Sequence, residues 1–222
     1  MQESRTQHRE TANCLRRRVL LVVATSVVAA NAYSMVLYDQ LTNHTTTIIP
    51  SSWWYPDGYD GDTYSWDNFI LRKPSYIKEV RWVGGGGPID GVTVRFYEGL
   101  AGYPDYQPKI SALPESETSR DYLKGYRFTL AQTHPTSIGG GLYSYYVTLP
   151  EWLLLPGHTV YWIKIEGDDP SGNSWGIVRA SHGRDTTHFR FITGGTFQRI
   201  TGDLGIQLVG DPALFSIFGV RR

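Results

Sequence analysis

The segment that decides the fold is TVYWIKIE, Thr159–Glu166. It is short, rich in β-branched and aromatic residues, and bounded by Pro156-Gly157 before it and Gly167-Asp168 after it. Runs of this composition between turn residues are typical of β-strands, whereas an amphipathic helix repeats its apolar residues every three or four positions. The segment therefore predicts a strand.

Nine more segments have the same character. They are Ser34–Leu41, Asp67–Lys73, Tyr76–Gly84, Val92–Glu98, Tyr126–Thr133, Tyr143–Leu149, Ser174–Ser181, Thr187–Ile192 and Gly205–Val209. Together with the first segment they predict about ten strands joined by turns, the pattern of a β-sandwich or jelly roll. No long helix is predicted, so we expect an all-β, antiparallel, jelly-roll-like sandwich. The run Gly84–Gly87 before Pro88 predicts a flexible turn between two antiparallel strands.

The N-terminal residues have the organisation of a secretion signal. Arg16-Arg17-Arg18 precedes an apolar run, Val19–Ala30, and Ala30-Asn31-Ala32 fits the small-x-small pattern of a cleavage site. We therefore expect residues 1–32 to be a signal peptide and residues 33–222 to be a single β-sandwich domain, secreted or held at the cell surface.

An uncleaved signal anchor stays open as the alternative. The apolar run has 12 residues, and a spanning helix needs roughly 20. Continuing the run to Leu37 would lengthen it. After cleavage, no membrane span is expected.

The charge of the chain argues against nucleic acid as a partner, and its cysteine content argues against stabilisation by disulfides. The chain has 21 basic and 21 acidic residues, and loss of five arginines and two glutamates with the leader leaves a net charge of −3. Nucleic acid is therefore not an expected partner, because it requires a clustered basic face. The one cysteine, Cys14, lies in the leader, so the mature chain has no disulfide and depends on its hydrophobic core.

Several segments resemble a group of uncharacterised secreted bacterial β-sandwich domains that often occur with PEP-CTERM sorting anchors. The segments are Leu37–Gln40, Asp67–Phe69, Val94–Pro104, Tyr146–Ile165 and Ser174–Ser181. The string L-x-P-G-x-Y-W-(V/L)-x-I of that group is matched by Leu155-Pro156-Gly157, Tyr161-Trp162 and Ile165, with one extra residue before the aromatic pair. The resemblance implies a jelly-roll-like fold and a cell-surface or matrix setting, and it supplies no catalytic residues.

Two sets of residues have side chains that could serve in catalysis or metal binding. Ser174 lies in a G-x-S-x-G motif, but a strand is expected after it in place of the helix that a nucleophile elbow needs. His182, Asp185 and His188 are expected in a turn and a strand, without a further ligand nearby. We interpret both sets as structural.

The carboxylates that a glycosidase would need are grouped in a predicted turn or scattered. The first kind comprises Glu166, Asp168 and Asp169, and the second Glu98, Glu151 and Asp67. Hydrolysis of a glycoside requires two carboxylates about 5 to 9 Å apart across one bond, and the sequence does not pair any two of these. No enzymatic activity is expected, and a glycoside hydrolase is the lesser alternative.

The candidate ligand site is the aromatic and acidic stretch SSWWYPDGYDGDTYSWDNF, residues 51–69. Saccharide sites combine a flat aromatic wall with a few polar groups, and we expect the loop from Ser51 to Asp67 to supply both. The predicted ligand-binding residues are Trp53, Trp54, Tyr55, Asp57, Tyr59 and Tyr64. Asp57, Asp60 and Asp62 are the predicted calcium ligands, because a glycine-rich loop with several carboxylates can wrap that ion. Trp82, Trp152 and Trp162 are expected in the core.

These observations favour a secreted, non-catalytic surface or matrix binding module with carbohydrate, or another cell-surface polymer, as its leading partner. No cofactor is expected apart from calcium. The alternative is a structural protein that self-associates through its apolar N-terminal strand by pairing of strand edges.

The leader generates the first testable prediction. Mass spectrometry of the secreted protein should find Tyr33 at the N-terminus, because cleavage follows Ala32. Recovery of the intact chain from Met1 in a membrane fraction would instead support the anchor.

Overall fold

Two packed β-sheets of eight strands each account for most of the residues that the structure describes. The computed structural model describes residues 34–54, 62–100, 103–110, 122–172, 174–181, 187–191 and 198–213. All of them belong to one compact unit, Ala32–Arg222. The predicted all-β sandwich is confirmed, while the predicted leader lies outside the described residues.

Sheet A is built around β5, which has β10 on one side and both β16 and β12 on the other. Strand β1 lies beside β16, β9 beside β10, and β2 and β15 beside β12. The bounds are β1 Met35–Asp39, β2 His44–Pro50, β5 Ser75–Gly85, β9 Thr136–Gly139, β10 Leu142–Leu155, β12 Gly176–Ala180, β15 Asp203–Leu204 and β16 Ile206–Pro212. All of these pairs are antiparallel.

Sheet B is built in the same way around β11. Strand β6 pairs with one edge of β11, while β4 and then β3 pair with the other, β3 in parallel. Strands β7 and β8 lie beside β6, β13 beside β4, and β14 beside β13. The bounds are β3 Ser52–Trp54, β4 Thr63–Ile70, β6 Gly91–Leu100, β7 Tyr103–Pro108, β8 Lys124–Thr129, β11 Val160–Asp169, β13 Thr187–Phe191 and β14 Gln198–Ile200.

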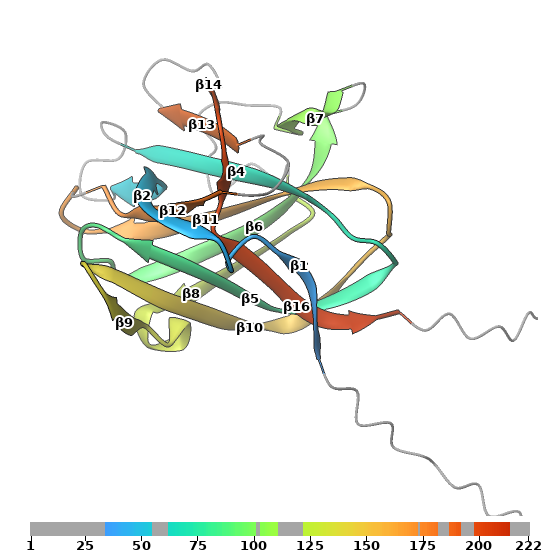
Figure 1. Ribbon diagram of the computed structural model, residues 1–222, viewed down its shortest axis with the longest axis horizontal. Helices are drawn as coiled ribbons and strands as arrows, with labels where there is room; N and C mark the ends of the chain where they lie inside the picture. Colours follow the sequence, from blue (N-terminus) through green and yellow to red (C-terminus); the bar gives the residue numbers. More distant parts are fainter. Residues whose placement is uncertain are drawn as a thin grey trace, which may run out of the picture. The chain divides into compact units, whose positions relative to one another are not determined.

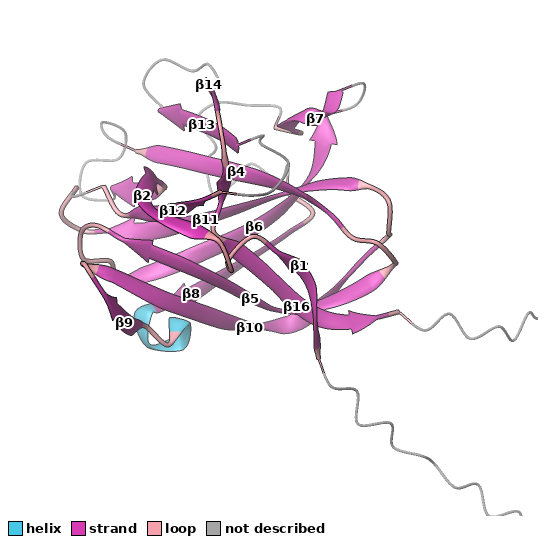
Figure 2. Ribbon diagram, viewed as in Figure 1, coloured by secondary structure: helices cyan, strands magenta, loops and turns pink. Residues whose placement is uncertain are grey.

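Consecutive long strands alternate between the two sheets, which is the connectivity of a jelly roll. The chain passes from β4 in sheet B to β5 in sheet A and back to β6, and later from β10 through β11 to β12 (Figure 1). The described helical structure is one short 3-10 turn, η1 (Leu130–Thr133), shown beside β9 in Figure 2. None of the described helical structure has the length and apolar character required to span a bilayer.

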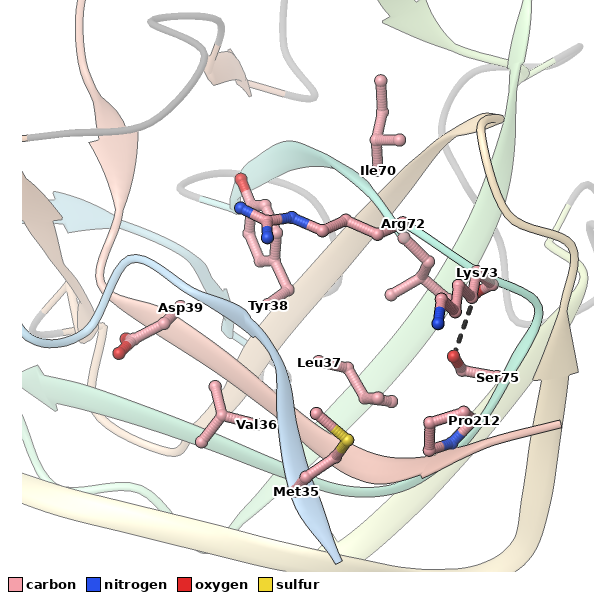
Figure 3. A pocket seen from close by; sticks show the side chains of 11 residues that line it. Met35, Val36, Leu37, Tyr38, Asp39, Ile70, Arg72, Lys73, Ser75 and Pro212 are labelled. Carbon is pink, nitrogen blue, oxygen red and sulfur yellow. Dashed lines mark hydrogen bonds between the residues drawn. The ribbon is translucent and has the colours of Figure 1, made fainter. Parts of the chain in front are cut away.

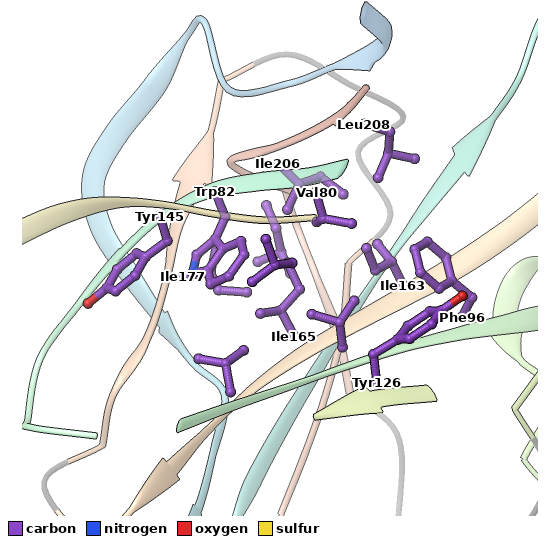
Figure 4. Close-up of a cluster of buried hydrophobic side chains, with 14 of the residues drawn as sticks. Val80, Trp82, Phe96, Tyr126, Tyr145, Ile163, Ile165, Ile177, Ile206 and Leu208 are labelled. Carbon is purple, nitrogen blue, oxygen red and sulfur yellow. The ribbon is translucent and has the colours of Figure 1, made fainter. Parts of the chain in front are cut away.

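The inward faces of both sheets form one continuous core (Figure 4). Trp82 is fully buried and stacks on Tyr145, with ring centroids 5.3 Å apart. Tyr145 in turn meets Trp175 edge to face at 6.0 Å. The remainder of the core includes Val80, Phe96, Tyr126, Ile163, Ile165, Ile177, Ile206 and Leu208. Alternate residues of β11 enter this core, as the period of a strand requires.

The predicted flexible turn at Gly84–Gly87 is wrong in its first half. Gly84 and Gly85 are buried members of β5, and β5 and β6 lie in opposite sheets. A Cβ on Gly84 would lie 2.6 Å from the Gly176 carbonyl oxygen and 2.9 Å from the Trp175 ring. Glycine is needed there because β12 and Trp175 pack directly against the backbone. The turn begins at Gly86, which has a φ of 107°.

The predicted strand count was too low, and two loop assignments were wrong. The described residues form 16 strands, and most of those missed are short or polar. Ser52–Trp54 and Thr63–Ile70 are strands, so the predicted loop from Ser51 to Asp67 is interrupted at both ends. Asp168 and Asp169 belong to β11, and the turn follows them. The carboxylate of Asp169 accepts hydrogen bonds from the backbone amides of Ser171 and Gly172, both at 2.8 Å.

The prediction that Trp152 lies in the core is wrong. Trp82 and Trp162 are fully buried as expected, but Trp152 is 59% exposed. It lies in the part of β10 where the register with β5 shifts between Thr148 and Leu153. This irregularity breaks the alternation from which an inward position was expected. The ring lies on the outer face of sheet A, where Lys78 Nζ is 3.7 Å from its centroid.

Asp67 points into the sandwich from β4 and is fully buried. Its two carboxylate oxygens accept hydrogen bonds from the backbone amides of Asn68 at 2.8 Å and Leu204 at 2.7 Å. Burial, reinforced by the negative charge of the buried Asp203, nevertheless raises the pKa of Asp67 well above 3.8. Protonated Asp67 is therefore favoured by folding, and the free energy of unfolding falls as the pH rises from 3.8 through the raised pKa.

Asp67→Asn should remove this pH dependence, because the amide keeps a hydrogen-bond acceptor and cannot ionise. We expect the unfolding free energy of the variant, relative to the wild type, to rise between about pH 4 and about pH 8. Urea unfolding followed by tryptophan fluorescence at both pH values measures it. Asp90→Asn, at an exposed position, is the control for loss of a carboxylate at the surface. A parallel pH dependence of the wild type and Asp67→Asn would contradict the assignment.

Candidate functional site

The candidate site lies on the outer face of sheet B, where charged and aromatic side chains are buried together. We call this set the outer cluster and define it by Tyr64, Trp66, Trp162, Lys164 and Glu166. The three aromatic residues form a hydrophobic cluster separate from the main core, together with Tyr97. All five residues of the outer cluster are at most 4% exposed.

Strand pairing explains why these side chains meet. Trp162, Lys164 and Glu166 alternate along β11, so they project on the face opposite to Ile163 and Ile165. In the neighbouring strands, Lys164 is paired with Trp66 of β4 and with Arg95 of β6. Tyr122 and Ile110 pack against the aromatic rings from outside the sheet. Sheet B is thus buried on both faces along β11.

Lys164 is the centre of the outer cluster. Its side chain has no exposed surface, and Nζ lies 2.5 Å from Glu166 Oε2. The same nitrogen is 4.1 Å from the centroid of the Tyr64 ring and 5.6 Å from that of Trp66. A buried ammonium is costly unless it is paired, and here a carboxylate and two aromatic faces surround it.

A second ion pair marks the end of β11 nearest the predicted binding loop. Arg127 Nε and Nη2 lie 3.2 and 3.1 Å from Asp168 Oδ2. The Arg127 guanidinium carbon is 5.6 Å from the centroid of the Trp53 ring, because β3 pairs Trp53 with Asp168. We call Trp53, Arg127 and Asp168 the rim. The arginine side chain is 56% exposed and that of Asp168 is 6% exposed, so the rim meets solvent mainly through Arg127.

Asp62 links strand β3, next to the rim, to Tyr64 of the outer cluster. One carboxylate oxygen accepts a hydrogen bond from the Trp54 backbone amide at 2.7 Å, and the other from the Tyr64 hydroxyl at 3.3 Å. The Trp54 ring contacts the backbone at Gly172, where a Cβ would lie 3.1 Å from it. Trp53 and Trp54 are both half-buried, whereas Tyr64 and Asp62 are buried.

The structure therefore brings together part of the predicted site. Trp53, Trp54 and Tyr64 lie within one region of sheet B, while Tyr55, Asp57 and Tyr59 lie outside the described residues. The ligand-binding role of all six stays a prediction. Lys164 and Arg127 were missed, and Glu166 and Asp168 were considered only as carboxylates of a predicted turn. A Lys-x-Glu-x-Asp alternation does not by itself reveal that the face carrying these side chains is buried.

The predicted calcium set is only partly visible. Asp57 and Asp60 lie outside the described residues, and the Asp62 carboxylate is hydrogen-bonded within the protein. Among the residues that the structure describes, no group of three or more His, Cys, Asp or Glu side chains could hold a metal ion. Calcium binding by this loop stays a prediction.

The other residues weighed for chemistry are placed as follows. Ser174 is exposed with a φ of 57° and is followed by β12, so no helix starts at this motif. His188 is in β13, as predicted, while His182 and Asp185 lie outside the described residues. Glu98 and Glu151 are exposed and pair with Lys109 and Lys124.

Comparison with known proteins adds no assignment to this geometry. No protein-family model matches the chain, and neither a curated protein nor a solved structure matches it.

Lys164 is buried against Glu166, so removing one partner should lower the free energy of unfolding far more than removing both. Glu166→Gln should cost about 3 to 5 kcal/mol of unfolding free energy, because it leaves a buried ammonium without its carboxylate. Adding Lys164→Met should restore a large part of that loss. Urea unfolding of both single variants and the double variant measures the coupling. A loss below about 1 kcal/mol for Glu166→Gln would mean that the pair is accessible to water.

Proposed function

We propose that the protein is a secreted, non-catalytic binding module of the cell surface or extracellular matrix, with carbohydrate as its ligand. The observation that supports the proposal is the rim. Trp53 offers an aromatic ring, Arg127 a cation with several donors, and Asp168 a carboxylate, all at one end of sheet B. Saccharides present apolar C–H faces and hydroxyl groups, and this combination complements both.

The position of the rim also supports a ligand role. Trp53 is the last but one residue of β3, immediately before the aromatic and glycine-rich segment that follows Trp54. Strand β3 is anchored at both of its edges, by β11 and by β4. A ring on such a strand is held in place before the ligand arrives, which reduces the conformational entropy lost on binding.

The non-catalytic part of the proposal is supported by the state of the carboxylates. Glu166 pairs with Lys164, and Asp168 pairs with Arg127. A glycosidase requires one carboxyl group that can donate a proton and a second that is free to attack or to activate water. Carboxylates that are neutralised by fixed cations suit structural or ligand-orienting roles better.

Trp53→Ala tests the site. We expect it to weaken binding to saccharides that the wild type retains on a glycan array by about 1 to 3 kcal/mol, because the stacking ring is lost. Thermal unfolding should change little, since Trp53 is only half-buried. Isothermal titration with the best saccharide of the array measures the affinity.

Two tryptophan variants serve as controls. Trp82→Ala should destabilise the fold by about 3 to 5 kcal/mol, because it empties the centre of the core. Trp152→Ala should leave both stability and binding nearly unchanged, although its ring is the more exposed. Loss of saccharide binding with Trp152→Ala but not with Trp53→Ala would move the site to the outer face of sheet A. Absence of binding to any glycan by the wild type would reject the proposal.

A further inference from the structure

A cavity of about 730 Å³ opens at the side of the sandwich beside β1 (Figure 3). All five residues of β1 line it, from Met35 to Asp39, whereas the neighbouring β16 contributes only Pro212. The opposite wall is the connection from β4 to β5, residues 70–73, with Ser75. The volume is typical of a pocket that binds a ligand.

The wall opposite β1 is held firmly in place. The Leu71 carbonyl accepts a hydrogen bond from the His158 backbone amide at 2.8 Å, and the Pro74 carbonyl accepts one from Ala213 at 2.8 Å. Gly157 packs so closely that a Cβ there would lie 2.7 Å from the Lys73 backbone. The cavity is therefore bounded by fixed backbone on this side.

The other side of the cavity is a strand edge. Among the described strands, β1 pairs with β16 alone, so its second edge has backbone amide and carbonyl groups available for another strand. The Tyr38 hydroxyl donates to the Asn68 carbonyl at 3.1 Å, which ties β1 to β4 behind the cavity. Met35 and Val36 are 51% and 46% exposed. Exposed apolar edges of this kind are sites of strand addition.

The charge of the cavity indicates the chemistry of an occupant. Arg72 and Lys73 are both exposed at its mouth, and neither forms an ion pair with a described residue. The single acidic residue of the lining, Asp39, is already engaged by the backbone amides of Leu41 and Thr42 at 2.9 and 3.2 Å. The cavity thus combines an apolar floor with two cations that pair with no carboxylate in the described part of the chain.

We propose that this cavity binds an extended segment of another protein, in which acidic residues alternate with apolar ones. The segment adds to the free edge of β1 as a strand. Its apolar side chains then point toward Leu37 and Leu71, and its carboxylates meet Arg72 and Lys73. Main-chain hydrogen bonds supply affinity in this mode, and the cavity supplies selectivity.

A second copy of the chain fits this edge less well. Symmetric pairing of two β1 strands would bring two sets of Arg72 and Lys73 toward one interface, and like charges repel. The register of β1 also shifts between Val36 and Tyr38, and such a bulge in both partners would disrupt a regular ladder. A short foreign segment needs only one edge and supplies the missing negative charge.

The test uses the mature protein and a fluorescent peptide in which valine alternates with glutamate, titrated by anisotropy. We expect saturable binding, weakened about tenfold by the double variant Arg72→Gln/Lys73→Gln. Arg81→Gln, which removes one positive charge from the outer face of sheet A, should change the affinity less than about twofold. A peptide of valine and lysine should not bind.

Backbone pairing has its own control. The valine–glutamate peptide with N-methyl groups on alternate residues keeps its side chains and loses one row of donors, so it should bind at least about tenfold more weakly. Equal binding of the methylated peptide would overturn strand addition, and equal binding to the double variant would overturn the role of the two cations. Concentration-dependent dimerisation that competes with the peptide would assign the edge to a second copy and reject the proposal.

Discussion

The burial of β11 on both faces is the constraint on which the rest of the structure depends. Antiparallel sheets commonly leave one face in water, but every residue from Tyr161 to Asp169 is buried. The inward residues Ile163 and Ile165 join the main core, which needs no polar partner. The outward residues include Lys164 and Glu166, and burial is tolerable for them only as a pair. The ion pair and the aromatic rings around it follow from this double burial.

The two sheets consequently differ in what their outer faces can do. Sheet B is covered along its centre, so contact with a ligand is confined to its rim, where Arg127 remains in solvent. Sheet A buries Val83, Leu142 and Val178 in a separate hydrophobic cluster, but it exposes Tyr146 and Trp152 along β10. Aromatic exposure on sheet A is greater, and Trp152 also has a cation and an anion beside it, since Lys78 Nζ lies 3.7 Å from its ring centroid and pairs with Asp211. The rim is the better candidate because Trp53 also adjoins the aromatic and acidic segment that follows Trp54.

Short alternating segments bounded by turn residues were sufficient to predict the sandwich, because the strand period of two appears directly in the sequence. The period does not reveal what covers a face. Glu166 was therefore assigned to a turn and Lys164 to no site, although tertiary packing buries both. The prediction that Trp152 lies in the core was wrong because a shift of register in β10 places its ring on the outer face. Three residues of the candidate region, Trp53, Trp54 and Tyr64, could be predicted from the sequence. Their cross-strand partners come from segments more than 50 residues away along the chain, so the pairing could not be inferred.

The rim and the cavity lie toward opposite ends of the same strand. Trp53 is paired with Asp168 near one end of β11, while Ile70, which lines the cavity, is paired with Val160 at the other. At roughly 3.4 Å per residue, Val160 and Asp168 are about 27 Å apart. A bound peptide strand at β1 would therefore leave the rim uncovered. Because β11 is rigidly packed on both faces, the two positions are held at a fixed separation, an arrangement suited to joining a protein partner at one end to a surface polymer at the other.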